Sequence, residues 1–146
     1  MIKNIYAYFD ANHAIKTHDF IISVSGGMAG VKDYGQIESV LIHIQNDEYY
    51  PDFITKLNHL VFSFVKFHAF NDGNKRSGIA LGAYFLEING FDDCIRKFQK
   101  EMENIVVWVA ENKISKPLLE KIIESLIGEE DYSEELKLEI IDSLLQ

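Results

Sequence analysis

The chain of 146 residues contains a single cysteine, Cys94, and only two prolines, Pro51 and Pro117. One cysteine can form neither an intramolecular disulfide nor a two-cysteine zinc motif, so we expect a reducing compartment. The scarcity of proline leaves long stretches without a helix breaker. The longest nearly apolar run, residues 60–65, is far too short to span a bilayer. These absences predict a helical, cytoplasmic protein with no membrane partner.

Basic residues are also scarce, because 14 Lys and Arg stand against 23 Asp and Glu, which gives a net charge of -9. A protein that binds nucleic acid by neutralising phosphates needs a basic face, so this balance argues against direct nucleic-acid binding. It does not exclude a local basic site, because net charge does not report the chemistry of one cleft. The first residues lead straight into aromatic and charged residues, so we also expect no secretory signal.

The chain length fits one domain, and apolar residues recur at helical spacing along most of it. In the first such pattern, His18 recurs with Ile15, Ile21 and Ile22. Small residues interleaved in residues 79–88 are expected to let a neighbouring helix approach closely. The periodicity predicts helices over residues 10–24, 37–44, 51–67, 79–88, 95–112 and 115–128, and a short last helix from Ser133.

Two segments are left without a helix in this interpretation. Residues 25–36 hold four of the nine glycines and predict an ordered loop or a small β-hairpin. Residues 1–8 fit either a strand or a helix. We therefore expect an all-α fold, a compact bundle of residues 1–128 with a small flap, and an acidic C-terminal helix at residues 129–146 packed on the same domain.

One polar segment of nine residues lies between the two most apolar predicted helices. Its residues 71–73, Asn-Asp-Gly, are a strong turn signal, and a helix is expected to start at Gly73 or Asn74. The first N–H groups of that helix have no internal partner and, with the helix dipole, favour an anion. The missing side chain of Gly73 leaves room for a phosphate. The backbone alone therefore predicts an anion site.

The side chains of this segment suit phosphoryl chemistry. Arg76 can clamp a phosphate with its fork of donors, and Lys75 adds a compact positive charge. Asp72 is a hard oxygen ligand suited to Mg²⁺, which usually binds one or two carboxylates plus substrate phosphates. Histidine is the side-chain type that ionises near neutral pH, so His68 can accept a hydroxyl proton. Phe70 is expected to anchor the segment in the core.

A purely structural interpretation of the same residues is also open. Asn-Asp-Gly is often only a turn, Asp72 fits a helix N-cap, and a lone histidine at a helix end usually packs. Lys75 and Arg76 oppose the dipole at a helix start, which favours function, because a structural design would place acids there. The residues alone thus indicate an anion or nucleotide site with a candidate base.

The segment reads His-Ala-Phe-Asn-Asp-Gly-Asn-Lys-Arg and resembles the signature of the Fic/Doc family. Fic enzymes that transfer AMP carry Pro at the position of Ala69, Gly at that of Lys75 and Arg at that of Ile79. All three departures run toward the Doc (death-on-curing) branch, whereas Gly73 is Fic-like. His18-Asp19 and the glycines that follow also resemble the Doc N-terminal helix and flap, so the resemblance covers roughly residues 10 to 127.

This resemblance implies a compact helical fold with ATP and Mg²⁺ at the motif. In Doc toxins the γ-phosphate of ATP is transferred to a hydroxyl of elongation factor Tu, and an unstructured antitoxin neutralises the toxin. By position, His68 would be the catalytic base and Asp72 the Mg²⁺ ligand. The phosphates would lie against Gly73, Asn74, Lys75 and Arg76, and the flap with Gly26, Gly27 and Gly30 would dock the target protein.

The same comparison leaves other functions open. A lysine at position 75 fills the room of one phosphate and attracts another, which would turn the γ-phosphate toward His68. Gly73 supports the alternative, an AMP transferase, and a non-catalytic nucleotide- or peptide-binding module that keeps the fold is a third hypothesis. Ser125–Glu130 is the nearest match to the inhibitory Ser/Thr-x-x-x-Glu motif of Fic proteins. Because Gly128 would break that helix, we interpret the segment as a helix end.

Overall fold

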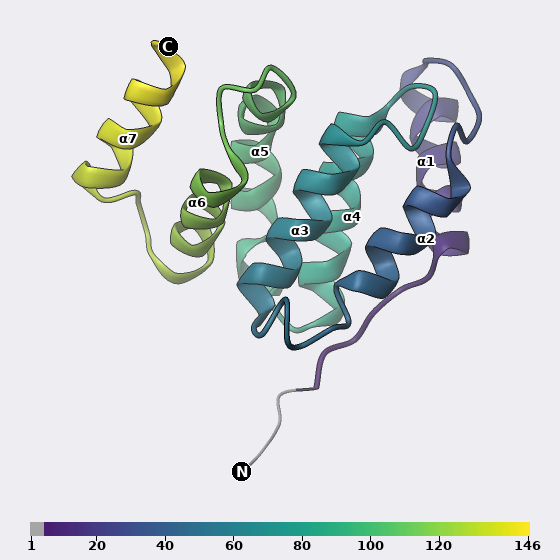
Figure 1. Cartoon of the computed structure of the whole chain (residues 1–146), viewed down its shortest axis with the longest axis horizontal. Coiled ribbons are helices and arrows are strands. Elements are labelled where there is room, and N and C mark those ends of the chain that lie inside the picture. Colours follow the sequence, from purple (N-terminus) through teal and green to yellow (C-terminus); the bar gives the residue numbers. More distant parts are fainter. Residues whose placement is uncertain (1–4) are drawn as a thin grey trace.

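The computed structural model describes residues 5–146, over which seven α-helices form one bundle and no strand is present (Figure 1). The prediction of an all-α fold is therefore confirmed. A short 3-10 turn, Asp92–Cys94, precedes the fifth helix. The helices are α1 (Ala11–Ser25), α2 (Tyr34–His43), α3 (Phe53–Lys66), α4 (Asn74–Ile88), α5 (Ile95–Ala110), α6 (Lys116–Gly128) and α7 (Glu134–Leu144).

Helix α3 is the centre of the bundle and packs against α4, α5 and α6. The close approach of α4 to its neighbours depends on glycine, as expected from the small residues in this segment. A Cβ atom on Gly82 would lie 2.8 Å from Cζ of Phe98 and 2.9 Å from Cγ2 of Val61. Any larger residue at position 82 would therefore push α4 away from α3 and α5.

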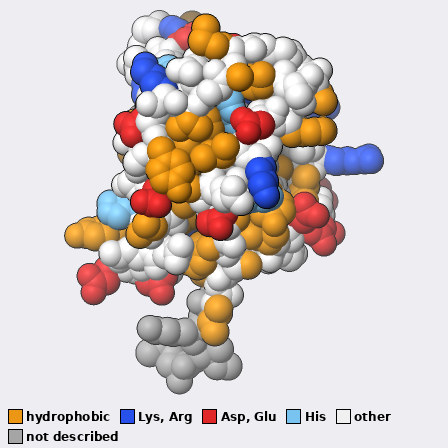
Figure 2. Space-filling model, turned by 90° about the vertical axis from the view of Figure 1, so that its right-hand side faces the viewer, with side chains coloured by type: hydrophobic (Ala, Val, Ile, Leu, Met, Phe, Trp, Pro, Cys, Tyr) orange, Lys and Arg blue, Asp and Glu red, His pale blue; other side chains and the backbone are white. Residues whose placement is uncertain are grey.

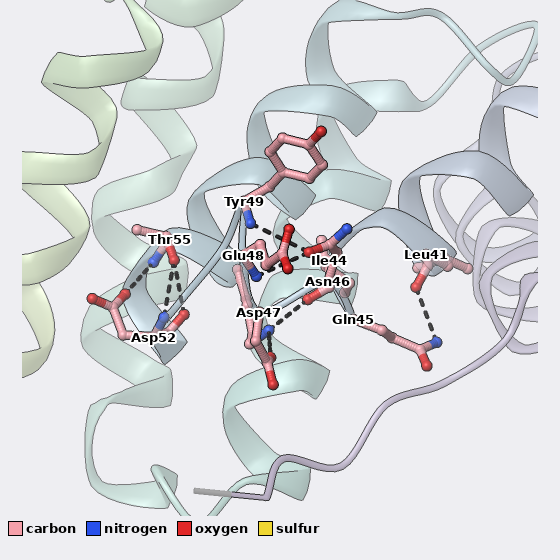
Figure 3. Close-up of polar contacts among 10 residues, drawn as sticks. Leu41, Ile44, Gln45, Asn46, Asp47, Glu48, Tyr49, Asp52 and Thr55 are labelled. Carbon is pink, nitrogen blue, oxygen red and sulfur yellow. Dashed lines mark hydrogen bonds and ion pairs between the residues drawn. The ribbon is translucent and has the colours of Figure 1, made fainter. Parts of the chain in front are cut away.

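The connection between α2 and α3 is fixed by local hydrogen bonds (Figure 3). Asn46 Oδ1 accepts from the N–H groups of Glu48 and Tyr49, and a capping box pairs Asp52 with Thr55 at the start of α3. One turn into α3, the fully buried Lys56 donates to the Ile44 carbonyl at 2.8 Å and to the Asp47 carboxylate at 2.7 Å. These bonds fix the start of the helix that ends at the polar motif.

The ends of several helices differ from their apolar patterns for local reasons. Helix α2 begins at Tyr34 because Asp33 caps it, with its Oδ1 atom accepting from Gln36 N–H at 3.1 Å. Helix α4 begins at Asn74, as the turn signal predicts and five residues before its apolar pattern, because its first turn belongs to the polar motif. The predicted caps of α6 and α7 are confirmed, since the Ser115 and Ser133 side chains accept backbone N–H groups.

The glycine-rich residues 26–33 form a loop, so the hairpin alternative is wrong. Val31 makes one isolated antiparallel bridge with Phe70, and the N–H groups of Lys32 and Asp33 both donate to the Ala69 carbonyl at 2.9 Å. The φ angles of the first glycines are positive, which a regular hairpin strand does not use. The flap therefore pairs with the motif loop instead of with itself.

The first described residues lie at the lower edge of the bundle in Figure 1, whereas α7 and the C-terminus lie at its left-hand side. Residues 1–4 lie outside the described part, and residues 5–10 form neither strand nor helix, so neither alternative for residues 1–8 is found in the described portion. Helix α7 packs beside α6 through Leu136. Over residues 5–146, no helix has the length and apolar character needed to cross a bilayer.

The side of the molecule that carries α1 and α2 has a surface rich in hydrophobic side chains (Figure 2). Charged side chains of both signs are scattered around them on this face. The exposed apolar residues of these two helices are Phe20, Val24, Tyr34 and Ile42. The end of α1 leads directly into the flap, so this apolar surface adjoins the loop that covers the motif.

Candidate active site

The motif loop connects α3 to α4 and is anchored by Phe70, which is fully buried and lies 6.1 Å from the Phe64 ring between centroids. The Asn74 side chain brackets the Phe70 backbone. Its Oδ1 atom accepts from Phe70 N–H at 3.1 Å, and its Nδ2 atom donates to the Phe70 carbonyl at 3.0 Å. The Asn74 side chain is thus committed to the loop, and only its backbone N–H is free to meet an anion.

Gly73 is the N-cap of α4 and has a φ of 77°, in the left-handed region that favours glycine. A Cβ atom there would lie 3.2 Å from Cδ1 of Ile22 and 3.4 Å from Nη2 of Arg76. Room for a phosphate is therefore not the only reason for glycine, since backbone conformation and packing also require it. The N–H groups of residues 74–76 have no acceptor within residues 5–146, which leaves the expected anion site at the start of α4.

Asp72 is exposed, and both of its carboxylate oxygens accept backbone hydrogen bonds. Oδ1 accepts from Gly73 N–H at 2.8 Å, and Oδ2 accepts from Met28 N–H in the flap at 3.0 Å. The N–H bonds from Met28 and Gly73, with the charges of Arg76 and Lys75, hold the pKa of Asp72 below its ordinary value. Asp72 does not cap α4, because the N-cap is Gly73. Its carboxylate is therefore ionised and anchored by two backbone N–H groups.

The flap lies directly against Asp72 and Arg76. Arg76 Nη1 donates to the Gly26 carbonyl at 2.8 Å and to the Ser25 hydroxyl, and Arg76 Nη2 lies 3.9 Å from Asp72 Oδ1. A Cβ atom on Gly27 would lie 2.7 Å from Asp72 Oδ2 and 3.0 Å from Arg76 Nη2. The absence of a side chain at position 27 therefore allows the flap to close over both groups.

The next flap glycine is held by the residue that begins the Asn-Asp-Gly turn. Asn71 N–H donates to the Gly30 carbonyl at 3.1 Å, and Asn71 Nδ2 donates to the Ala29 carbonyl at 3.1 Å. A Cβ atom on Gly30, whose φ is 110°, would lie 2.7 Å from Asn71 Nδ2. Gly27 and Gly30 thus fix the two ends of a short flap segment on the motif.

His68 and Lys75 are exposed members of the motif whose side chains have no partner in the described residues. His68 follows the end of α3 with a φ of 50°, an uncommon conformation for a residue with a side chain. Within residues 5–146, neither side chain makes a hydrogen bond or an ion pair. The structure therefore brings Asp72, Arg76 and the flap into contact, while it leaves the candidate base and the lysine open to solvent.

An open cavity of about 450 Å³ adjoins Arg76 between α1, α4 and α5. Ile79, at the position where Fic enzymes carry a second arginine, contributes an apolar side chain to it. The cavity contains one positive and one negative side chain, so its wall is mixed in charge. Its lining residues are Ile21, Arg76, Ile79, Ala80, Gln99 and Glu103.

The residues present fit a Mg²⁺ ion that arrives with a nucleotide. In the part of the chain that the structure covers, no three His, Cys, Asp or Glu side chains converge as a metal site. Asp72 supplies a single ionised carboxylate beside the free N–H groups of α4. Mg²⁺ commonly uses one carboxylate together with substrate phosphates, so one acid at this place is sufficient.

His18 is a site residue that the sequence indicates only through a helix face and a family resemblance. It is fully buried, and its Nε2 atom lies 2.6 Å from the carbonyl oxygen of Asp72. Its ring stacks on Phe70 with centroids 3.8 Å apart and planes 3° apart. The only local sign of a special role is that His18 is a polar residue inside an otherwise apolar helix stripe. Its hydrogen-bond partner, Asp72, is 54 residues away in the sequence.

Two comparisons with known proteins agree with this geometry. The model of the Fic/DOC family matches residues 8–86, which span α1 to α4 with the flap and the motif and make up more than half of the chain. The chain is also similar to "Protein kinase doc" of Escherichia phage P1, with 29% identity over 119 residues that cover 78% of this chain and 90% of the phage protein. The resemblance to the Doc branch is thereby confirmed, and the chain belongs to the Fic/DOC family.

Proposed function

We propose that this protein is a Doc-like toxin that transfers the γ-phosphate of ATP to a hydroxyl of a target protein, a translation factor such as elongation factor Tu. The observation that carries the proposal is the start of α4. Free backbone N–H groups, the ionised Asp72 and the Arg76 fork meet there beside an unpaired Lys75. The similarity to a protein named as a kinase supports γ-phosphate transfer.

Different residues of the motif would bind the phosphates and the Mg²⁺ ion. The N–H groups of residues 74–76 and the Arg76 guanidinium would hold the phosphates, because preorganised donors are most effective where charge develops. Asp72 would hold Mg²⁺, which supplies charge neutralisation to the phosphates when bound. Lys75, whose side chain makes no hydrogen bond or ion pair within residues 5–146, would attract the phosphate closest to His68.

His68 would act on the target hydroxyl. The imidazole takes the hydroxyl proton while the oxygen forms a bond to the γ-phosphorus, and the bond from that phosphorus to the bridging oxygen breaks to release ADP. The exposed side chain of His68 suits a base that must reach a protein substrate. The flap around Gly26, Gly27 and Gly30 would dock the segment of the target that carries the hydroxyl.

Further parts of the proposal concern partners and organisation. An antitoxin of the Doc type is the proposed neutralising partner, and the cytoplasm is the proposed compartment because translation factors act there. We place the Fic/Doc domain in residues 1–128 and treat residues 129–146 as an appended acidic helix on the same domain.

The test uses the full chain with purified elongation factor Tu and ATP labelled at either the α- or the γ-phosphate. We expect label only from the γ-position, and we expect His68→Ala to lower the rate by about 10²–10⁴-fold. His43→Ala is the matched control, because His43 is an exposed histidine on α2, outside the motif. Failure of His68→Ala to lower the rate would remove His68 as the base.

An AMP transferase is the second candidate, and Gly73 is the residue that favours it. However, the left-handed φ of Gly73 and its close packing against Ile22 already require a glycine at this position. The glycine is therefore not by itself evidence for AMP transfer. Label transferred from the α-position would establish this second candidate. ATP binding without transfer to any protein of a cytosolic extract would instead support a non-catalytic binding module.

A further inference from the structure

His18 lies on α1, 54 residues before Asp72 in the sequence, and contacts three residues of the motif. Its ring lies parallel to Phe70, its Nε2 atom is 2.6 Å from the Asp72 carbonyl oxygen, and a Cβ atom on Gly73 would be 3.5 Å from the same nitrogen. Because a carbonyl oxygen can only accept, Nε2 must carry the hydrogen in this bond. The other ring nitrogen, Nδ1, has no hydrogen-bond partner within residues 5–146.

The hydrogen bond from His18 is joined to the Asp72 carboxylate through one peptide unit. The Asp72 carbonyl and the Gly73 N–H belong to the same planar amide. The carbonyl accepts from His18 Nε2, while the N–H at the other side of that amide donates to Asp72 Oδ1 at 2.8 Å. A donor on the carbonyl fixes the plane of the amide and strengthens its N–H as a donor.

We propose that His18 is a positioning residue for the Asp72 carboxylate. The chain of bonds runs from His18 Nε2–H to the Asp72 carbonyl, across the amide, and from Gly73 N–H to Asp72 Oδ1. It holds the carboxylate at the start of α4, where the proposed function places Mg²⁺ and the phosphates. The inference about metal binding rests on that function, whereas the bond chain itself does not.

Stacking and hydrogen bonding at position 18 can be separated by substitution. His18→Phe keeps a flat ring against Phe70 and removes the donor to Asp72. His18→Gln removes the ring but keeps an amide N–H that can reach the carbonyl. Asp19→Asn is the matched control, because Asp19 Oδ1 is 3.6 Å from His18 Nδ1, away from the nitrogen that meets the motif.

The first readout is binding of ADP by calorimetry, with and without Mg²⁺, to the full chain and its variants. We expect His18→Phe to leave ADP affinity without Mg²⁺ unchanged and to reduce the gain on adding Mg²⁺ by about tenfold, a typical loss when a group behind a metal ligand is removed. We expect His18→Gln to recover part of the gain and Asp19→Asn to retain all of it. Loss of ADP affinity alone, with the Mg²⁺ gain intact, would overturn the proposal.

The second readout needs neither metal nor activity. In ¹⁵N NMR spectra of the unaltered protein, we expect the His18 ring to carry its hydrogen on Nε2, and we expect the Gly73 amide proton to shift upfield in His18→Phe and to return toward its place in His18→Gln. A hydrogen on Nδ1 alone would overturn the bond chain even if every variant failed to fold. If Asp72→Asn leaves the Mg²⁺ gain unchanged while the Gly73 shift behaves as expected, the metal assignment fails and the bond chain stands.

Discussion

The flap offers the sharpest single test of how the site is closed, through Gly27→Ala. The new Cβ atom would lie 2.7 Å from Asp72 Oδ2, 3.0 Å from Arg76 Nη2 and 3.1 Å from Ile22 Cδ1, at a φ of 118°. Gly26→Ala is the matched control, because Gly26 has a φ of 85° and a Cβ atom added there would meet no other atom within 4 Å. Both substitutions strain the backbone, and only the first adds a clash.

The magnitudes follow from that difference. We expect Gly26→Ala to lower the free energy of unfolding by about 1–3 kcal/mol through backbone strain. We expect Gly27→Ala to cost about 1–3 kcal/mol more, as overpacking typically does. Moving the flap would also break the bond from Met28 N–H to Asp72 Oδ2, so the pKa of Asp72 should rise toward its ordinary value in Gly27→Ala only.

Urea unfolding would give the free energies, and NMR of the Asp72 carboxyl carbon across the acidic range would give its pKa. Equal destabilisation by the two substitutions would refute the close approach of the flap. An unchanged Asp72 pKa in Gly27→Ala would refute the conclusion that Met28 N–H contributes to holding the carboxylate ionised. Either result would mean that the flap does not rest on Asp72 and Arg76 in solution.

Three further predictions concern charged groups. Burial, and to a smaller extent neighbouring positive charge, lowers the pKa of His59 to about 4. The free energy of unfolding should therefore fall by about 2 kcal/mol as the pH drops from about 6.5 to about 4. The His59→Phe variant should lack this pH dependence. Lys56→Met removes the donors to Ile44 and Asp47 and should cost about 2 kcal/mol in urea unfolding, and an unchanged midpoint would contradict a structural role for this amine. Lys75→Gly should lower transfer of γ-label to the target by about tenfold, because one charge-assisted phosphate contact is lost, and an unchanged rate would show that Lys75 does not touch the phosphates.

Helices can be predicted from the sequence where the signal is local. The apolar stripe of α5 and the caps Ser115 and Ser133 each involve residues within a few positions of one another. The local sequence pattern is therefore sufficient to predict these helices. Apolar periodicity alone would predict that α4 starts at Ile79, because the first turn of that helix consists of polar motif residues. Only the turn signal before Asn74 indicates where the helix begins. The nine-residue motif itself is recognisable because its residue types and order are specific.

What the sequence does not predict depends on pairs far apart in the chain. The flap pairs with Ala69 and Phe70, about forty residues later, and no local pattern distinguishes this from a hairpin. The same holds for His18, whose place in an apolar stripe suggests packing alone. The sequence suggests Gly73 as space for a ligand, and only its φ and its neighbours in space show the additional structural reason.

The bonds of Arg76 to Ser25 and Gly26 give the proposed function a thermodynamic consequence. A phosphate that takes the donors of Arg76 Nη1 must displace these acceptors, so part of its binding free energy goes into releasing the end of α1. A target segment that draws the flap away would make that release unnecessary and would tighten nucleotide binding. Reciprocity then requires the nucleotide to tighten target binding by the same factor. The target protein and the nucleotide would therefore bind cooperatively, because either one binding alone must spend free energy on opening the flap.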